Sequence, residues 1–409
     1  MNVVFLSPAY PPEMQQFTRG LAEVGARVLG VGDSHPDALP GPLRGHLSDY
    51  LAVPRIMDED DVIARVGRWL GGRRPDRIET NWEPLTILAA RMRAAFGVPG
   101  MSEDVVRGFR DKPLMRERVA AAGLRVPRSE RARTRGEVWA AALRVGFPLI
   151  VKPVAGAGSA DTFRVDAPGA LEGVLDQLRH VPEVSVEEFV EGDEYTYETL
   201  CIDGRPVHES VCQYHPNALV ARQNEWISPV IQSVRDLDEP RVRGGVALGR
   251  AVLGALGMGT GFTHMEWFRR TGPGADGEAV FGEIACRSPG ANMVDLMNYS
   301  ADIDLFREWA RVVCWKSFEG TNARPWSAAI VFKRAEGQGH IARVDGLQDF
   351  LRRHGRAVVR EDLLPVGAPR RDWKQTFLSD GNLVVRTPDF GETLRVAMDA
   401  AATIRMHAR

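Results

Sequence analysis

The sequence predicts an α/β protein with more than one domain. The chain has 409 residues, which at about 150 residues per domain suggests two to three domains. Short apolar strands alternate with amphipathic helices up to about residue 110, an order typical of a parallel sheet. Hydrophobic residues make up 44% of the chain and charged residues 26%, so the chain can bury a large core.

Composition and charge argue against several classes of partner. Acidic residues number 54 and basic residues 52, a balance that argues against nucleic-acid binding. No apolar run approaches the roughly 18 residues of a membrane span, and the N-terminus has no basic leader. The four cysteines lack Cys-x-x-Cys spacing and are expected to be reduced thiols. We therefore expect a cytoplasmic protein without nucleic-acid or membrane partners.

Hydrophobic periodicity and turn residues place the expected elements in order. Gly25 and Gly123 are suited to end helices, and Pro113 to the first turn of one. The expected strands are 3–7, 26–32, 76–79, 147–152, 162–165, 184–190, 194–202, 262–268 and 279–285. The expected helices are 14–24, 59–70, one from about 111, one through 171–178, 240–256 and 301–313, and the segment 326–409 is expected to hold short strands and one helix.

Lys152 ends an apolar strand and precedes a loop of small residues that includes Gly156, Gly158 and Ser159. Glycine lets backbone N–H groups approach phosphate oxygens without a Cβ atom in the way, and the lysine adds a point positive charge. The pattern favours phosphate binding. The alternative is a lysine that reaches solvent before a hairpin turn.

Paired acids end the next strand, at Glu187 and Glu188, and Val190 and Glu194 follow across a glycine turn. Such a crossing can offer backbone hydrogen-bonding groups to an adenine edge, and Glu194 can accept hydrogen bonds from ribose hydroxyls. The alternative is a solvated acidic turn.

The most informative pattern joins two predicted strands. His264 and Glu266 lie two residues apart, so both point to the same face, and Glu283 can meet Glu266 across the ladder. Two facing carboxylates repel unless a cation lies between them, and such oxygen ligands hold magnesium in proteins. Arg287 follows on the chain, and its guanidinium group can bind a carboxylate or an acyl phosphate through two parallel hydrogen bonds. The alternative is that the acids pair with the abundant arginines.

Taken in their order along the sequence, these motifs resemble those of the ATP-grasp superfamily, and the resemblance covers nearly the whole chain. The residues that match its nucleotide-binding motifs are Arg110-Asp111-Lys112-Pro113, Val151-Lys152-Pro153 with the small-residue loop, Glu187, Glu188, Val190 and Glu194. The residues that match its two magnesium-bearing strands are His264-Met265-Glu266-Trp267 and the run from Glu283 to Gly290. One position departs from the family pattern: Ala285 stands where many members have asparagine, and alanine offers no side-chain ligand to a second magnesium ion.

The resemblance implies an ATP-grasp fold with four parts. These are an N-terminal Rossmann-like α/β domain (1–111), a small lid subdomain (112–192), a C-terminal α+β catalytic subdomain (193–325) and an added α+β module (326–409).

The resemblance also implies a chemistry, with ATP as the nucleotide. Lys112 and Lys152 would hold the phosphates, and Gly156, Gly158 and Ser159 would form the lid over them. Glu187, Glu188 and Val190 would contact adenine, and Glu194 the ribose. Glu266 and Glu283 would hold Mg²⁺, for which Mn²⁺ can substitute, and Arg287 and His264 would be the catalytic residues.

The run from Arg287 to Gly290, with Asn292 and Asp295, resembles the amino-acid ligases and other carboxylate–amine ligases of the superfamily. This branch implies an enzyme that activates a carboxylic acid as an acyl phosphate and couples it to an amine. Its partners would be small-molecule acids and amines, and related enzymes are often homodimers. Two alternatives stay open: a carboxylase of the biotin-carboxylase or purine-biosynthesis type, and a non-catalytic nucleotide-binding sensor.

The substrate pocket is the least readable feature of the sequence. The segment 213–226 is rich in polar and aromatic residues, so Arg222 or Trp226 can line an acceptor site, although surface positions are equally consistent. Ser288 and Asn292 are further candidates for substrate contacts.

Overall fold

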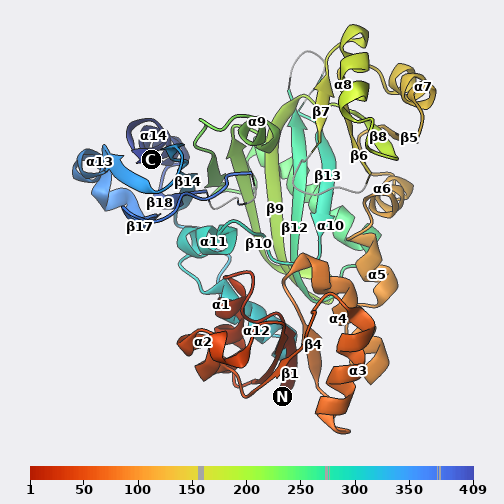
Figure 1. Cartoon of the computed structure of the whole chain (residues 1–409), viewed down its shortest axis with the longest axis vertical. Coiled ribbons are helices and arrows are strands. Elements are labelled where there is room, and N and C mark those ends of the chain that lie inside the picture. The colour runs from red at the N-terminus through yellow and green to blue at the C-terminus, as the bar shows by residue number, and fades with distance from the viewer. Residues whose placement is uncertain (155–160, 272–274, 276, 375, 377–378) are drawn as a thin grey trace.

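One large sheet lies at the centre of the fold (Figure 1). The computed structural model describes every residue except 155–160, 272–274, 276, 375 and 377–378. In the described part of the chain this sheet has eight strands in the order β13-β12-β9-β10-β11-β14-β18-β17. Three smaller sheets accompany it, with the orders β3-β2-β1-β4, β5-β8-β6-β7 and β15-β19-β16. In the view of Figure 1 the N-terminal part lies at the lower end of the long strands, the β5–β8 part at the upper right, and the C-terminal part, which contributes strands to the large sheet, at the left.

The N-terminal part is a parallel α/β sheet, as the alternating pattern predicts. In α3, Val62, Val66 and Leu70 are buried at helical spacing, and Gly71 ends the helix in a left-handed conformation. Its strands are β1 (Asn2–Leu6), β2 (Arg27–Gly32), β3 (Asp49–Ala52) and β4 (Arg77–Glu79). Its helices are α1 (Met14–Glu23), η1 (Pro36–Ala38), α2 (Gly41–His46), α3 (Glu59–Leu70), η2 (Glu83–Leu85) and α4 (Thr86–Phe96).

A small antiparallel sheet follows two connecting helices, α5 (Glu103–Gly108) and α6 (Lys112–Ala121). The Asp111 side chain caps α6 by accepting a hydrogen bond from Leu114 N at 3.0 Å, which fixes Lys112 as the first helical residue. The remaining elements here are β5 (Ser129–Ala132), α7 (Arg135–Val145), β6 (Leu149–Pro153), β7 (Phe163–Val165), η3 (Pro168–Ala170), α8 (Leu171–Gln177) and β8 (Val184–Glu188).

The large sheet begins with long antiparallel strands that α10 covers on one face. A Cβ atom at Gly249 would lie 2.2 Å from the Tyr197 ring, so glycine lets α10 approach the sheet closely. A hairpin turns at Asp203-Gly204 between β9 and β10, with positive φ at both residues. The elements are β9 (Gly192–Ile202), β10 (Arg205–His215), α9 (Ala218–Gln223), β11 (Val230–Ser233), α10 (Pro240–Leu256), β12 (Gly261–Arg270) and β13 (Ala279–Ala285).

The helix predicted over 301–313 is present but begins later than expected, at Leu305. The chain forms α11 (Met293–Ala301) and α12 (Leu305–Trp315), with a break between them. Asp302 adopts the left-handed conformation, and the Asp304 carboxylate accepts a hydrogen bond from Arg307 N at 3.2 Å. Short acidic side chains favour such caps over helix interiors, which is why the helix stops and restarts here.

The C-terminal part shares the large sheet, because β14, β18 and β17 extend it beyond β11. The other three strands form the small sheet at the end of the chain. The elements are β14 (Ser327–Phe332), β15 (Glu336–Gly337), β16 (Ile341–Asp345), α13 (Leu347–His354), η4 (Gly355–Ala357), β17 (Val358–Leu363), β18 (Gly381–Thr387), α14 (Phe390–Thr403) and β19 (Arg405–Ala408). The boundaries of the four parts given above stay predictions.

Within the described residues, no helix combines the length and the apolar character that crossing a bilayer requires. All four cysteines are free and buried, in agreement with reduced thiols.

Candidate active site

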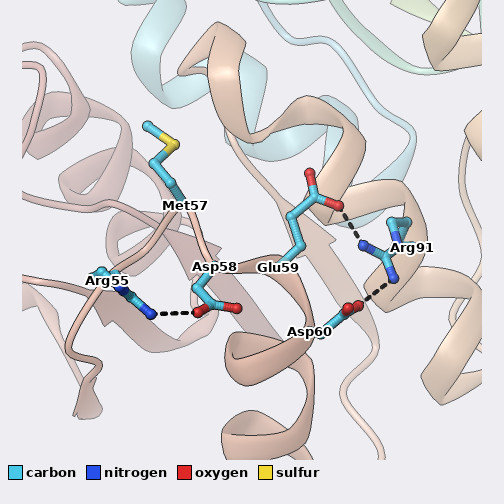
Figure 2. Close-up of a pocket in the computed structure, with 6 residues that line it drawn as sticks. All are labelled: Arg55, Met57, Asp58, Glu59, Asp60 and Arg91. Atoms are coloured by element: carbon cyan, nitrogen blue, oxygen red, sulfur yellow. Dashed lines mark hydrogen bonds and ion pairs between the residues drawn. The ribbon is translucent and has the colours of Figure 1, made fainter.

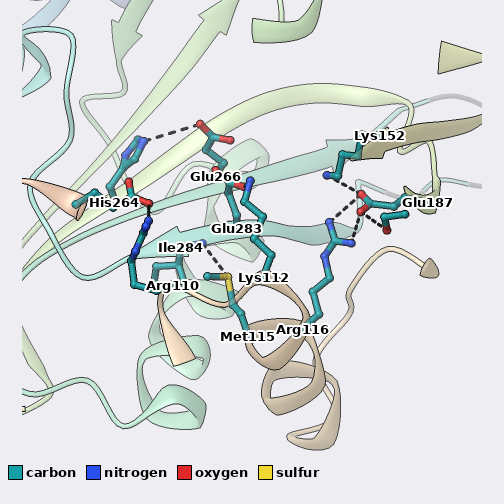
Figure 3. Close-up of polar contacts among 12 residues, drawn as sticks. Arg110, Lys112, Met115, Arg116, Lys152, Glu187, His264, Glu266, Glu283 and Ile284 are labelled. Atoms are coloured by element: carbon teal, nitrogen blue, oxygen red, sulfur yellow. Dashed lines mark hydrogen bonds and ion pairs between the residues drawn. The ribbon is translucent and has the colours of Figure 1, made fainter. Parts of the chain in front are cut away.

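Lys112 meets the predicted metal carboxylates where α6 approaches β13. Its Nζ atom lies 2.5 Å from Glu283 Oε2 (Figure 3). Burial lowers the pKa of Lys112, but the charges of Glu283 and then Glu266 outweigh burial and raise it overall. The ammonium group therefore stays charged beside these two acids.

Glu266 and Glu283 are direct partners across the β12–β13 ladder. His264 shares their region, with Nε2 3.9 Å from Glu266 Oε1, as the two-residue spacing predicts. Burial and the neighbouring charge of Glu283 raise the pKa of Glu266 to about 7. A divalent cation would relieve this repulsion, and carboxylate oxygens are the donors that Mg²⁺ prefers.

The two residues therefore fit a magnesium site in which the protein supplies only part of the coordination. Across the described ranges, no group of three or more His, Cys, Asp or Glu side chains is arranged to hold a metal ion. Glu266 and Glu283 would be the protein's ligands, and Ala285, at the end of β13, offers no side-chain donor. The assignment of these metal ligands stays a prediction.

Lys152 lies on β6, where its Nζ atom is 2.8 Å from Glu187 Oε2 (Figure 3). Arg116, on α6, donates two hydrogen bonds to the same carboxylate, at 2.5 and 2.8 Å, and Ser185 Oγ donates a third at 2.8 Å. Burial raises the pKa of Glu187, but these cationic partners outweigh burial and lower it to about 2. Arg116, which sequence reasoning missed, thus ties α6 to the β5–β8 sheet.

Replacing Glu187 with glutamine should destabilise the protein at pH 7 and much less in acid. The folded-state pKa is depressed from 4.5 to about 2, so the stabilisation is present above pH 4.5 and is lost as pH falls toward 2. We expect the free energy of unfolding to fall by about 3 kcal/mol at neutral pH. Urea unfolding of both proteins across this pH range measures the difference.

Glu130→Gln is the matched control for this prediction, because Glu130 lies in the same sheet and pairs with Arg144. Glu130 is only partly buried, with 34% of its side chain exposed, so solvent screens its ion pair and its replacement should cost much less. A stability difference for Glu187→Gln that does not change with pH would contradict the assigned ionisation of Glu187.

The residues predicted to contact adenine and ribose lie at the crossing from β8 to β9. Arg125 donates to Glu188 at 2.6 Å, so ion pairs occupy both paired acids, and adenine would meet the backbone here rather than these side chains. Val190 is buried. Glu194 is also buried and accepts a hydrogen bond from Ala218 N, at the start of α9, at 2.7 Å. Gly156, Gly158 and Ser159 lie outside the described residues.

Arg287 is held by an acid that sequence reasoning missed. Its Nε and Nη2 atoms donate to Glu83 Oε2 at 3.1 and 2.9 Å, and Arg110 donates to the other oxygen of Glu83. Glu83 comes shortly after β4, beyond the carboxyl end of a parallel strand, where α/β sheets commonly bind ligands. This position after a predicted strand is the sequence signal from which Glu83 could have been named as a candidate. Glu83 therefore brings the N-terminal part to the end of β13.

The four substrate candidates fall in two places. Ser288 is buried beside Arg287, and its N–H donates to Asn81 Oδ1 at 3.3 Å. Asn292 precedes α11 in a left-handed conformation. Arg222 lies on α9, and Trp226 follows that helix with 73% of its surface exposed. Substrate roles for all four stay predictions.

Arg222→Ala tests whether α9 contributes to an acceptor site. If Arg222 contacts a substrate, we expect the KM of that substrate to rise about tenfold, the effect of losing one charge-assisted hydrogen bond. The ATP KM serves as the internal reference. Unchanged KM values for all substrates would remove Arg222 from the site.

A separate hollow on the N-terminal part has no comparable chemistry. It is lined by Arg55, Met57, Asp58, Glu59, Asp60 and Arg91, and its charges pair with one another (Figure 2). Arg55 pairs with Asp58, and Arg91 with Glu59 and Asp60. These are ordinary surface ion pairs, which contribute little to the stability of the protein.

Sequence comparison connects the chain to proteins that include ligases. It is 26% identical over 316 residues to uncharacterized protein y4rH of Sinorhizobium fredii, covering 74% of this chain and 63% of that protein. It is 24% identical over 281 residues to the L-arginine-specific L-amino acid ligase of Bacillus subtilis, covering 65% and 64%. ATP-grasp enzyme fsqD of Aspergillus fumigatus is 25% identical over 228 residues, which cover 53% of this chain and 38% of that enzyme. These matches span less than two thirds of each relative, and no protein-family model matches the chain.

Structural comparison extends over almost the whole chain. An L-amino acid ligase from Bacillus licheniformis superposes with a TM-score of 0.78 at 19% identity, covering 100% of this chain and 98% of that one. N5-carboxyaminoimidazole synthetase from Staphylococcus aureus, solved with ADP, superposes with a TM-score of 0.70 at 13% identity, covering 96% and 95%.

The fold is therefore that of the ATP-grasp proteins, and the predicted resemblance to this superfamily is confirmed. Among these proteins, the chain resembles L-amino acid ligases in both sequence and structure.

Proposed function

We propose that this protein is an ATP-dependent carboxylate–amine ligase. It would activate a carboxylic acid, an amino acid in our proposal, as an acyl phosphate and couple it to an amine, releasing ADP and phosphate. The supporting observation is that α6, β6, β12 and β13 bring together Lys112, Lys152, the pair Glu266 and Glu283, and Arg287 at the end of β13. Similarity to two L-amino acid ligases favours an amino acid as the acid.

The main difficulty of this chemistry is the negative charge of the phosphoryl group, which residues of this chain can neutralise. A carboxylate becomes a good electrophile only after phosphorylation, and transfer of the γ-phosphoryl group requires neutralisation of its oxygens. Lys112 and Lys152 provide that charge, and each is now paired with an acid, Glu283 or Glu187, that phosphate oxygens would replace or share. Mg²⁺, when held by Glu266 and Glu283, would supply further neutralisation.

Arg287 would hold the acid substrate. Its guanidinium fork can bind a carboxylate, and then the acyl phosphate made from it, through parallel N–H bonds. Glu83 and the Ser288 carbonyl, which accepts a hydrogen bond from Nη1 at 2.8 Å, restrict the orientation of the fork. The fork is thus preorganised for the reacting group, which favours catalysis by orientation.

ADP release from ATP and magnesium should be measured against amino acids, singly and in pairs, with products identified by mass. We expect one acid–amine pair to stimulate ADP release and to give a product lighter than their sum by one water. Stimulation by bicarbonate alone would instead favour the carboxylase alternative. ATP binding without turnover under every condition would favour the nucleotide sensor.

A further inference from the structure

A carboxylate lies buried in the centre of the large sheet, on β9, one strand away from the proposed metal ligands. The Glu198 side chain is fully buried, and its Oε1 atom lies 2.9 Å from Nδ1 of His264. The two residues are direct partners across the β9–β12 ladder, so the sheet register fixes their contact. The second oxygen, Oε2, has no hydrogen-bond partner among the described residues.

Burying this carboxylate lowers the stability of the folded protein. An ionised carboxylate loses several kcal/mol of hydration on burial, and a single hydrogen bond does not replace it. The buried acid Glu187, by comparison, is satisfied by Arg116, Lys152 and Ser185. The only polar partner of Glu198 that we find in the described chain is His264, so the arrangement serves the histidine rather than the stability of the sheet.

His264 has one ring nitrogen committed and the other directed at the proposed site. Since a carboxylate oxygen accepts hydrogen bonds, Nδ1 is the nitrogen that donates to Glu198. Nε2 then faces Glu266 at 3.9 Å, and 11% of the histidine side chain is exposed (Figure 3). A carboxylate bound to one imidazole nitrogen fixes both the orientation of the ring and the nitrogen presented on its other side.

We propose that Glu198 is a positioning residue, which holds the His264 ring so that Nε2 faces the reacting groups. This proposal rests on the proposed function, because it assumes that acyl transfer takes place beside Glu266 and Arg287. It predicts that Glu198 acts on the reaction only through His264 and has no direct contact with ATP or with either substrate.

A double-mutant cycle tests this dependence. Glu198→Gln keeps the volume of the side chain but removes the charge, and we expect kcat to fall 10- to 100-fold while the ATP KM stays unchanged. In a His264→Gln background, the same substitution should change kcat less than about threefold, because the ring it positions is absent. Equal losses in both backgrounds would overturn the proposal.

Two further variants separate positioning from general damage to the sheet. Glu209→Gln removes a carboxylate from the neighbouring strand β10, where Glu209 bonds the Tyr197 hydroxyl and Arg250, and it should leave kcat unchanged. Glu198→Asp retains the charge with a shorter reach and should restore part of the activity lost in Glu198→Gln. If Glu198→Asp is no better than Glu198→Gln, the carboxylate is not acting by holding the ring.

A readout that does not need turnover distinguishes failure of this proposal from failure of the proposed function. Imidazole ¹⁵N NMR of the full chain should show His264 with its hydrogen on Nδ1, and loss of that preference in Glu198→Gln. If the wild type ligates no acid–amine pair, the proposed function fails while this signature can still appear. If Glu198→Gln leaves the His264 signals unchanged, the positioning role fails even in an active enzyme.

Discussion

Replacing Glu283 with alanine is expected to reduce magnesium-dependent ADP release at least about 1,000-fold. The substitution removes one of two facing carboxylates and leaves Lys112 without the partner that lies 2.5 Å away. Both changes affect the charges that would neutralise the transferred phosphoryl group, where single electrostatic contacts are commonly worth 100- to 1,000-fold. Steady-state ADP release at saturating ATP, titrated with Mg²⁺ and then with Mn²⁺, measures the effect.

Binding measurements show whether the loss of turnover comes from the metal. We expect Glu283→Ala to bind ATP without magnesium about as well as the wild type and to lose the increase in affinity that magnesium provides. Glu361→Ala, which removes an exposed carboxylate from β17, is the matched control and should behave like the wild type. An active Glu283→Ala enzyme with normal dependence on magnesium would contradict the metal assignment.

Replacing Arg287 with alanine is expected to lower kcat by about 100- to 1,000-fold while ATP binding is retained. Its fork would contact the acid and the acyl phosphate, so its loss removes donors that matter most in the transition state. Of the two arginines that bond Glu83 in the described part of the chain, Arg110 alone would remain. Calorimetric titration with ATP, alongside kcat and the KM of the acid, separates these effects.

Arg343→Ala is the matched control for this substitution, because Arg343 is exposed on β16 and pairs with Asp345 far along the chain from the site. We expect it to have no effect on kcat. Wild-type rates in Arg287→Ala would refute the proposed role of this arginine. A loss of ATP affinity equal to the loss of kcat would place Arg287 in the nucleotide site instead.

The strand pairings of the site were predictable from local patterns. The spacing of His264 and Glu266 and the hairpin to Glu283 placed three side chains together, because alternation along a strand and pairing across a ladder are short-range rules. The start of α6 at Lys112 was equally local, since Asp111 and Pro113 are helix-start residues. The start of the helix predicted over 301–313 was misplaced, because the break before Leu305 depends on two aspartates within an otherwise helical pattern.

The sequence by itself determined the order of the chemical groups along the chain and, through hydrophobic periodicity, most of the elements that hold them. Only the tertiary structure decided the partners: Glu83 with Arg287, Arg116 with Glu187, and Glu198 with His264. The residues in these pairs lie 204, 71 and 66 positions apart. No local rule links residues so distant. Their polar groups meet because burial of the surrounding apolar faces fixes how the sheets and helices pack, and each buried polar or charged group then requires a partner.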